Sequence, residues 1–141
     1  MRRHRRLALD TNVFIYDLEA NPRYTDLANS VFEWILQPGH AAVTSTVTLT
    51  EVLVGPFRSL DQKRADELFA FLGPYPHLEW ISPDLRIAEA AARFRVSYGL
   101  RTVDALQIAT ATMSQATCFV GNDLAFRHVK EIDTILLDDY L

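Results

Sequence analysis

The sequence predicts an α/β fold, a three-layer sandwich in which a central parallel sheet of four to five strands carries helices on both faces. Two patterns in the 141 residues lead to this fold class. Short, unbroken apolar runs, such as residues 7–9, are typical of strands buried on both faces of a parallel sheet. Segments with apolar residues at helical spacing alternate with these runs, as in βαβ units. No repeat or linker interrupts the alternation, so we expect one domain over residues 1–141.

Each expected element has its own signal. Apolar runs predict strands, which cover residues 5–10, 40–44, 78–81, 117–120 and 134–137. Apolar residues three and four positions apart predict helices, which cover residues 22–37, 46–54, 61–72, 83–98, 103–114 and a short segment near 126. A helix-like segment is also expected at residues 13–16, directly after Asp10. Ser45 or Thr46 is expected to cap the helix that Gly55-Pro56 ends, and Thr102 to cap the helix that follows it.

Composition limits the class of protein. The chain has 14 basic and 18 acidic residues, and its net charge of −4 argues mildly against a nucleic-acid partner. Setting four acids aside for a metal site leaves 14 residues of each sign, so the argument weakens if a cation is bound. No apolar run approaches the roughly 20 residues that cross a bilayer. The single cysteine, Cys118, excludes an internal disulfide and is expected to be buried, so we expect a cytoplasmic protein.

Two aspartates directly follow predicted strands. Asp10 comes after the run 7–9, and Asp123 follows the run 117–120 and a Gly-Asn step. In open α/β sheets ligands bind outside the carboxyl ends of the strands, where both side chains would lie. Each aspartate also has a structural explanation, Asp10 as a helix N-cap and Asp123 as a turn residue.

Two further carboxylates lie on helices that are expected to start just beyond such strands. Glu51 is the single acid in a very apolar helix, where Thr44 and Thr48 share its polar stripe. It is therefore either the solvated face of that helix or a buried carboxylate with a partner. Asp104 falls in the first turn of its helix, where the helix dipole favours an anion.

These four carboxylates can converge on one edge of the sheet. Acids packed together repel, and some take up protons unless a cation lies among them. Oxygen ligands suit hard ions such as Mg²⁺ or Mn²⁺. The histidines show no zinc spacing and are expected at the surface; they are His4, His40, His77 and His128. The residues thus predict a divalent metal site.

Four segments resemble the motifs of PIN-domain ribonucleases, and specifically of VapC-type toxins from type II toxin–antitoxin pairs. They are LALDTNVFIY, TSTVTLTEVLVGP, RTVDALQIATA and FVGND, in that order. The resemblance covers essentially the whole chain. It implies a PIN-like sandwich and an Mg²⁺- or Mn²⁺-dependent endoribonuclease whose products carry a 5′-phosphate and a 3′-hydroxyl. Matching positions imply an acidic quartet of Asp10, Glu51, Asp104 and Asp123, with Asn12 beside Asp10 and Ser45 or Thr46 at the edge of the site.

The last motif departs from the family in two places. Gly121 stands where Thr or Ser is usual, and Phe126 stands where a further acid often lies. We therefore expect Asp123 to be held more loosely than the other three acids. On the same reasoning, Gly121→Thr is expected to tighten metal binding, provided that Gly121 does not need a positive φ angle.

The resemblance also implies partners: an RNA substrate, a small antitoxin protein and a second copy of the chain in a homodimer. Arg101 and Arg127 are the expected RNA contacts, and Lys130 is expected to be a solvated charge. Most apolar side chains of residues 20–36 and 61–72 are expected in the core. The remainder would serve the antitoxin and the dimer.

Two other functions fit parts of the sequence. A phosphatase of the haloacid dehalogenase type also has an aspartate after its first strand. It needs a second acid two residues later, where this chain has Asn12, and a lysine in the site, for which only Lys63 and Lys130 exist. A PIN-like scaffold that binds RNA or protein without cutting would lack a central acid, and none is missing here.

Overall fold

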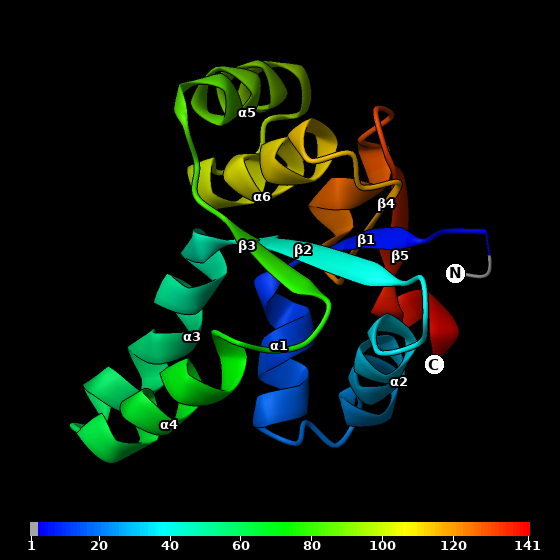
Figure 1. Cartoon of the computed structure of the whole chain (residues 1–141). Coiled ribbons are helices and arrows are strands. Elements are labelled where there is room, and N and C mark those ends of the chain that lie inside the picture. The colour runs from blue at the N-terminus through cyan, green and yellow to red at the C-terminus, as the bar shows by residue number, and fades with distance from the viewer. Residues whose placement is uncertain (1–2) are drawn as a thin grey trace.

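Five parallel strands form the central sheet of the computed structural model, which describes residues 3–141 (Figure 1). They are β1 (Arg6–Leu9), β2 (Ala41–Ser45), β3 (Leu78–Ile81), β4 (Cys118–Gly121) and β5 (Asp133–Leu136). Their order across the sheet is β3-β2-β1-β4-β5. The predicted parallel sheet is confirmed, with each strand within a residue or so of its expected place. The first two residues of the expected domain 1–141 lie outside the described part.

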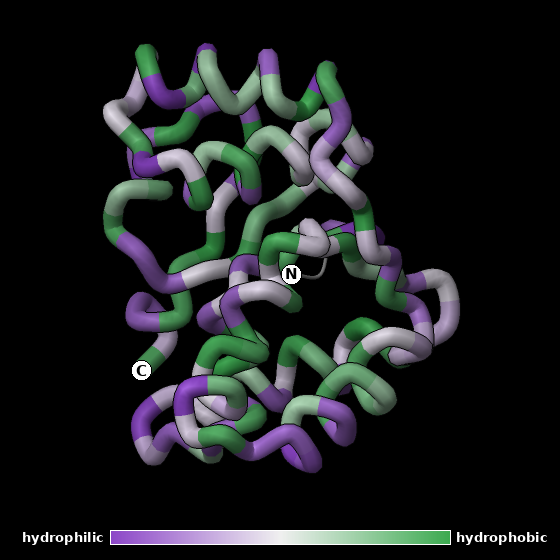
Figure 2. The backbone as a smooth tube through the Cα atoms, turned by 90° about the vertical axis from the view of Figure 1, so that its left-hand side faces the viewer, coloured by the Kyte–Doolittle hydropathy of each residue, from purple (hydrophilic) through white to green (hydrophobic). Residues whose placement is uncertain are grey.

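Helices cover both faces of this sheet. They are α1 (Thr11–Leu18), α2 (Thr25–Ile35), α3 (Thr46–Arg58), α4 (Gln62–Leu72), α5 (Leu85–Tyr98) and α6 (Thr102–Met113), with 3₁₀ turns η1 (Leu124–His128) and η2 (Leu137–Tyr140). Figure 1 shows α5 and α6 on one side of the sheet and α1 to α4 on the other. Along α5, at the top of Figure 2, hydrophobic and hydrophilic residues alternate, as in a helix that buries one face. Among the described residues, no helix is long and apolar enough to span a membrane.

Each face of the sheet has its own apolar core. On the α1–α4 side, the rings of Phe14 and Phe32 meet edge to face with centroids 5.2 Å apart. On the α5–α6 side, Phe119 of β4 packs on Phe126 of η1, 4.7 Å between centroids. Phe126 is fully buried, so the position where an acid often lies in the family serves the core of this chain. The two cores fix the sheet between the helix layers and hold its carboxyl edge in place.

Helix α3 ends later than its sequence predicts. Helix α3 runs through Gly55 and Pro56 to Arg58, so the predicted end at Gly55-Pro56 is wrong. Proline lacks only its own N–H, and the next turn closes normally because Ser59 N donates to Gly55 O at 3.1 Å. Ser45 is the predicted cap of α3, and its Oγ accepts from Val47 N.

Three other helix starts differ from the prediction. Helix α2 begins at Thr25, because the Asn21 side chain accepts from the backbone of residues 23 and 24 and holds the Pro22 region in a turn. Helix α5 begins at Leu85 and not at residue 83, and Asp84 caps it by accepting from Ile87 N. Thr102 is the first residue of α6, and the cap position is held by Arg101 without a side-chain bond to the helix.

One histidine also departs from its expected place. His4 is buried, and its Nδ1 lies 2.9 Å from Thr117 Oγ1, so the prediction of a surface histidine is wrong there. Burial, followed by the charge of Arg3, lowers the pKa of His4. Cys118 is buried as predicted, and burial raises the pKa of its thiol to about 11, which makes it an inert core residue.

The order of the strands determines where a ligand site can lie. From β1 the chain builds β2 and β3 on one side, then crosses to build β4 and β5 on the other. The crevice between β1 and β4 at their carboxyl ends is therefore the switch point of the sheet, where open α/β folds bind ligands. Asp10 follows β1 at this point, and Asp123 follows β4 after one intervening residue.

Candidate active site

Asp10 lies at the centre of the switch point. Its backbone N–H donates to Val120 O at 2.9 Å, which extends the β1–β4 ladder to the residue that carries the carboxylate. The residue is only 5% exposed. It occupies the cap position of α1, but its side chain makes no cap bond to that helix in the usual geometry. The cap position therefore explains where Asp10 lies in the chain, but it does not explain why its carboxylate is buried.

The pKa of Asp10 is raised to about 7. Burial is the main cause, and a hydrogen bond from the Thr11 backbone opposes it. The charges of Asp104, Glu51 and Asp123 each raise this pKa further. The other three carboxylates that the sequence singled out therefore all act on Asp10 at this edge of the sheet.

Asp104 is the second buried acid. It lies in the first turn of α6, is 8% exposed, and its Oδ2 accepts from Arg101 Nε at 3.1 Å. The same guanidinium reaches Asp123, with Arg101 Nη2 3.8 Å from Asp123 Oδ2. Arg101 is thus the cation that lies between these two carboxylates.

Asp123 has a divided role. Its Oδ1 accepts from Ala125 N at 2.9 Å and caps η1, so the turn explanation of this residue is correct for that oxygen. Its Oδ2 faces Arg101. More than a third of the Asp123 side chain is exposed, so Asp123 is more exposed than Asp104, the other aspartate that faces Arg101.

Glu51 is half-buried and has a partner. Its Oε1 accepts from the hydroxyl of Thr11 at 2.5 Å, between α3 and the start of α1. The sequence left this residue either solvated or partnered, and the structure selects the partner. Neither Thr11 nor its role was predicted, because the bond joins residues 40 positions apart.

A buried polar network supports Thr11. Gln107 of α6 donates from Nε2 to Thr11 Oγ1 at 3.2 Å and to Thr48 Oγ1 at 2.8 Å. Thr48 lies 2.7 Å from Thr44 Oγ1, which donates to Leu9 O at 2.9 Å. Each hydroxyl has one proton to donate, so Thr48 donates to Thr44 and Thr11 donates to Glu51. The stripe of Thr44, Thr48 and Glu51 was visible in the sequence; Gln107, the single amide in an apolar helix, was the signal that was missed.

Gly121 is the last residue of β4 and lies against Asp10. A Cβ at this position would be 3.2 Å from Asp10 Cβ and 3.4 Å from Asp10 Oδ2. It would also be 3.3 Å from the ring of Phe119. The close approach of the strand to the carboxylate, and not a positive φ, is the reason that glycine fits here.

The remaining predicted residues lie around this edge with weaker ties to the acids. Asn12 is in the first turn of α1 and half-buried, and Thr46 is the first residue of α3. Arg127 is exposed, with its Nη2 2.9 Å from Asp139 Oδ1. Lys130 is exposed, and its backbone N–H donates to the Tyr98 hydroxyl. Their roles toward metal or RNA stay predictions.

Comparison with known proteins identifies the family. The PIN domain profile matches residues 7–132, nearly the whole chain. This chain belongs to the PIN domain family. No curated protein sequence gives a significant match.

Solved structures share the PIN fold at low identity. A toxin–antitoxin complex from Klebsiella pneumoniae is 23% identical, with 93% of this chain and 97% of that chain covered and a TM-score of 0.67. DNA-bound VapBC from Salmonella typhimurium is 20% identical, with 94% and 98% covered and a TM-score of 0.69. VapC20 of Mycobacterium tuberculosis, described as a sarcin–ricin loop cleaving toxin, is 17% identical, with 90% and 98% covered and a TM-score of 0.69.

The site can be tested for the divalent ion that the resemblance implies. Its donors are carboxylate and hydroxyl oxygens, which suit Mg²⁺ or Mn²⁺, and Arg101 already places a positive charge between two of them. Within residues 3–141, no three His, Cys, Asp or Glu side chains are arranged to share an ion. The donor set therefore fits a hard cation in its chemistry.

Proposed function

We propose that this PIN domain is a metal-dependent endoribonuclease and the toxin of a toxin–antitoxin pair that acts in the cytoplasm. The observation that carries the proposal is the buried Asp10 carboxyl, which lies among the charges of Asp104, Glu51 and Asp123 and has a pKa of about 7. Such a cluster opposes folding at neutral pH unless a cation joins it. A bound divalent ion would offset the repulsion among these carboxylates, so a metal site explains why they lie together.

The burial of the four acids suggests a different role for the buried pair than for the more exposed pair. Asp10 and Asp104, the two buried carboxylates, would be the central ligands. Glu51 and Asp123 are more open to solvent and would complete the site or orient the attacking water. When bound, the metal would act as a Lewis acid on the scissile phosphate and lower the pKa of a coordinated water. Thr11 would keep one oxygen of Glu51 engaged, which leaves the other oxygen for the site.

The partners follow from the surface and from the relatives. Arg101 and Arg127 are exposed and could hold the RNA backbone. The similar VapC20 is described as cleaving the sarcin–ricin loop, which supports RNA as the substrate class. Several other similar structures are complexes with an antitoxin, which supports a small antitoxin protein as partner.

Exposed aromatic residues support a protein partner and a homodimer. The predicted apolar side chains divide as expected, since Phe32 and Trp34 are buried while Phe69 and Phe71 are more than half exposed. Phe57 of α3 is 50% exposed beside an open apolar surface with Leu49, Leu53 and Val54. Light scattering should give the mass of a dimer. A monomer at high concentration that copurifies with nothing from its native gene pair would contradict this part.

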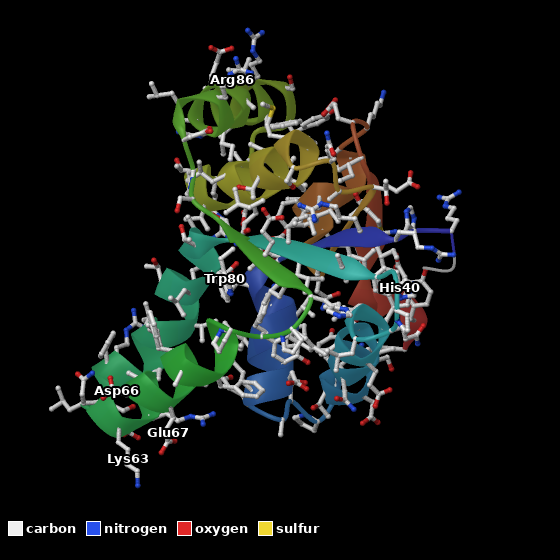
Figure 3. The ribbon with its side chains drawn as sticks, in the orientation of Figure 1. His40, Lys63, Asp66, Glu67, Trp80 and Arg86 are labelled. Carbon is white, nitrogen blue, oxygen red and sulfur yellow. The ribbon has the colours of Figure 1, made fainter. Side chains whose placement is uncertain are left out.

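The two alternatives lose support from the positions of particular residues. The phosphatase needs a lysine at the site, and Figure 3 shows Lys63 at the outer end of α4, away from the carboxyl edge of the sheet. Lys130 is exposed, with its backbone bound to Tyr98. The non-catalytic scaffold would be favoured by a lost acid, whereas all four acids are present and the charges of the other three reach Asp10.

The experiment is an RNA cleavage assay with purified protein, in Mg²⁺ or Mn²⁺ and in chelator. Wild type should cut RNA internally only with metal and leave 5′-phosphate and 3′-hydroxyl ends. Asp10→Asn should be inactive while its circular dichroism spectrum stays unchanged. Cleavage that persists in chelator, or full activity of Asp10→Asn, would refute the proposal. Binding of RNA without cleavage under every metal condition would favour the scaffold.

A further inference from the structure

Arg101 has a position that its predicted role as an RNA contact does not explain. Arg101 directly precedes α6, and its guanidinium lies beside the first turn of that helix. Its Nε lies 3.1 Å from Asp104 Oδ2, and its Nη2 lies 3.8 Å from Asp123 Oδ2. These two carboxylates come from different elements, α6 and the segment after β4. The guanidinium therefore lies between two carboxylates of different elements and pairs with both.

The charge of this group is permanent. A guanidinium does not lose its proton in proteins, so Arg101 supplies one positive charge to the acidic site at every pH at which the fold exists. The oxygens that it contacts are oxygens that a divalent ion would need. A guanidinium and a metal ion cannot both occupy the space between Asp104 and Asp123, so the two compete.

The side chain of Arg101 is free to leave. It is 80% exposed, so moving it opens no part of the core. Exposed ion pairs are weak, and each contributes little to stability. Once displaced from the carboxylates, the guanidinium would remain attached one turn from Asp104, at the rim of the site, where a phosphate could be bound bidentately.

We propose that Arg101 is an internal counter-ion that a divalent cation must displace, and that its displacement makes the guanidinium available to the RNA phosphate. This inference rests on the proposed metal-dependent cleavage. It assigns Arg101 two opposed effects. In the metal-free protein it competes for Asp104 and Asp123, and in the metal-loaded protein it contacts substrate. The arrangement couples RNA binding to metal loading.

The test is Arg101→Met, which keeps the length of the side chain and removes its charge. Calorimetric titration of Mn²⁺ should show binding about 3- to 10-fold tighter than in wild type, as expected for removing two weak competing ion pairs. Cleavage at saturating Mn²⁺ should fall by about 10-fold or more in kcat/KM, because a phosphate contact is lost. A merely structural role would not move these two readouts in opposite directions.

The matched control is Arg93→Met on α5. Arg93 also pairs with a carboxylate on its own helix, Glu89, at 3.3 Å, and its removal changes the net charge by the same amount. Mn²⁺ affinity and cleavage should both stay at the wild-type level. Mn²⁺ binding that Arg101→Met leaves unchanged or weakens, in a protein that cleaves RNA, overturns the inference alone. If wild type neither binds Mn²⁺ nor cleaves RNA, the proposed function fails and the inference fails with it.

Discussion

At the residue scale, Asp10 gives the clearest physical consequence. Its pKa is about 7 in the folded protein and 3.8 in the reference state, so the native chain holds a proton that the unfolded chain releases. Stability therefore falls as the pH rises from about 4 to 7, and the loss is complete above that range. In chelator, Asp10→Asn should be more stable than wild type, and its advantage should grow by about 2 to 3 kcal/mol between pH 5 and pH 8. Urea unfolding at the two pH values measures this difference.

The control for this pH effect is Asp66→Asn. Asp66 is exposed on α4, away from the site (Figure 3), so Asp66→Asn removes the same charge without touching the acids, and its stability difference from wild type at the two pH values is the reference for that of Asp10→Asn. An equal difference at pH 5 and pH 8 for Asp10→Asn would show that burial and neighbouring charges do not act on Asp10 as described.

Asp123 should matter less to activity than the buried acids. One of its oxygens already caps η1, and the side chain is partly exposed, so it is a looser ligand than Asp10 or Asp104. We predict that Asp123→Asn loses about 10-fold in cleavage rate and recovers partly at high Mn²⁺. Asp10→Asn and Asp104→Asn should lose at least about 100-fold without recovery. Equal loss in all three variants at saturating metal would place Asp123 on the same footing as the other two.

The surroundings of Gly121 argue against a larger residue at this position, contrary to the expectation from the sequence. Threonine was expected to tighten the site, but even an alanine Cβ would lie 3.2 Å from Asp10 Cβ, in packed surroundings. We predict that Gly121→Ala destabilises the protein by about 1 kcal/mol or more and weakens Mn²⁺ binding. Gly55→Ala is the matched control, because nothing lies within 4 Å of its added Cβ and alanine favours a helix. Gly55→Ala should stabilise by about 0.5 to 1 kcal/mol; a gain of stability in Gly121→Ala would refute the steric argument.

At the scale of elements, the buried network joins α1, β2, α3 and α6 beneath the acids. Thr48→Val would remove the acceptor of Gln107 Nε2 at 2.8 Å and leave that amide undersatisfied in the core. We predict a loss of about 1 to 3 kcal/mol in the free energy of unfolding. Thr110→Val is the control, since the hydroxyl of this buried threonine donates only along its own helix, to Leu106 O. Losses of the same size in both variants would show that the network adds nothing to the stability of these contacts.

Most secondary-structure elements could be predicted from the sequence, whereas one helix end and the contacts between elements could not. Strands and helices followed from apolar runs and spacing, because those patterns record which faces are buried. The end of α3 did not follow, because Val52 anchors the helix in the core and the chain continues past Gly55-Pro56 at the loss of one hydrogen bond. Thr11 and Gln107 escaped prediction because their partners lie on other elements, and no local pattern encodes a contact between α1 and α6.

At the scale of the whole molecule, the convergence of the acids depended on the sheet being parallel. That prediction needed only that strands end at a common edge. The parallel sheet is confirmed, and the charges of Asp104, Glu51 and Asp123 each act on Asp10. The strand order β3-β2-β1-β4-β5, which places Asp10 at the switch point, could not be read from the chain. It is set by which faces pack once the two cores form on either side of the sheet.

The metal site is tested most directly by a crystal of the protein soaked with Mn²⁺ and measured at a wavelength where manganese scatters anomalously. We predict an anomalous peak at the carboxyl edge between β1 and β4, with oxygens of Asp10 and Asp104 at about 2.0 to 2.3 Å and the Arg101 guanidinium moved off Asp104. Empty density at that edge under saturating Mn²⁺, or a peak bound away from Asp10, would contradict it.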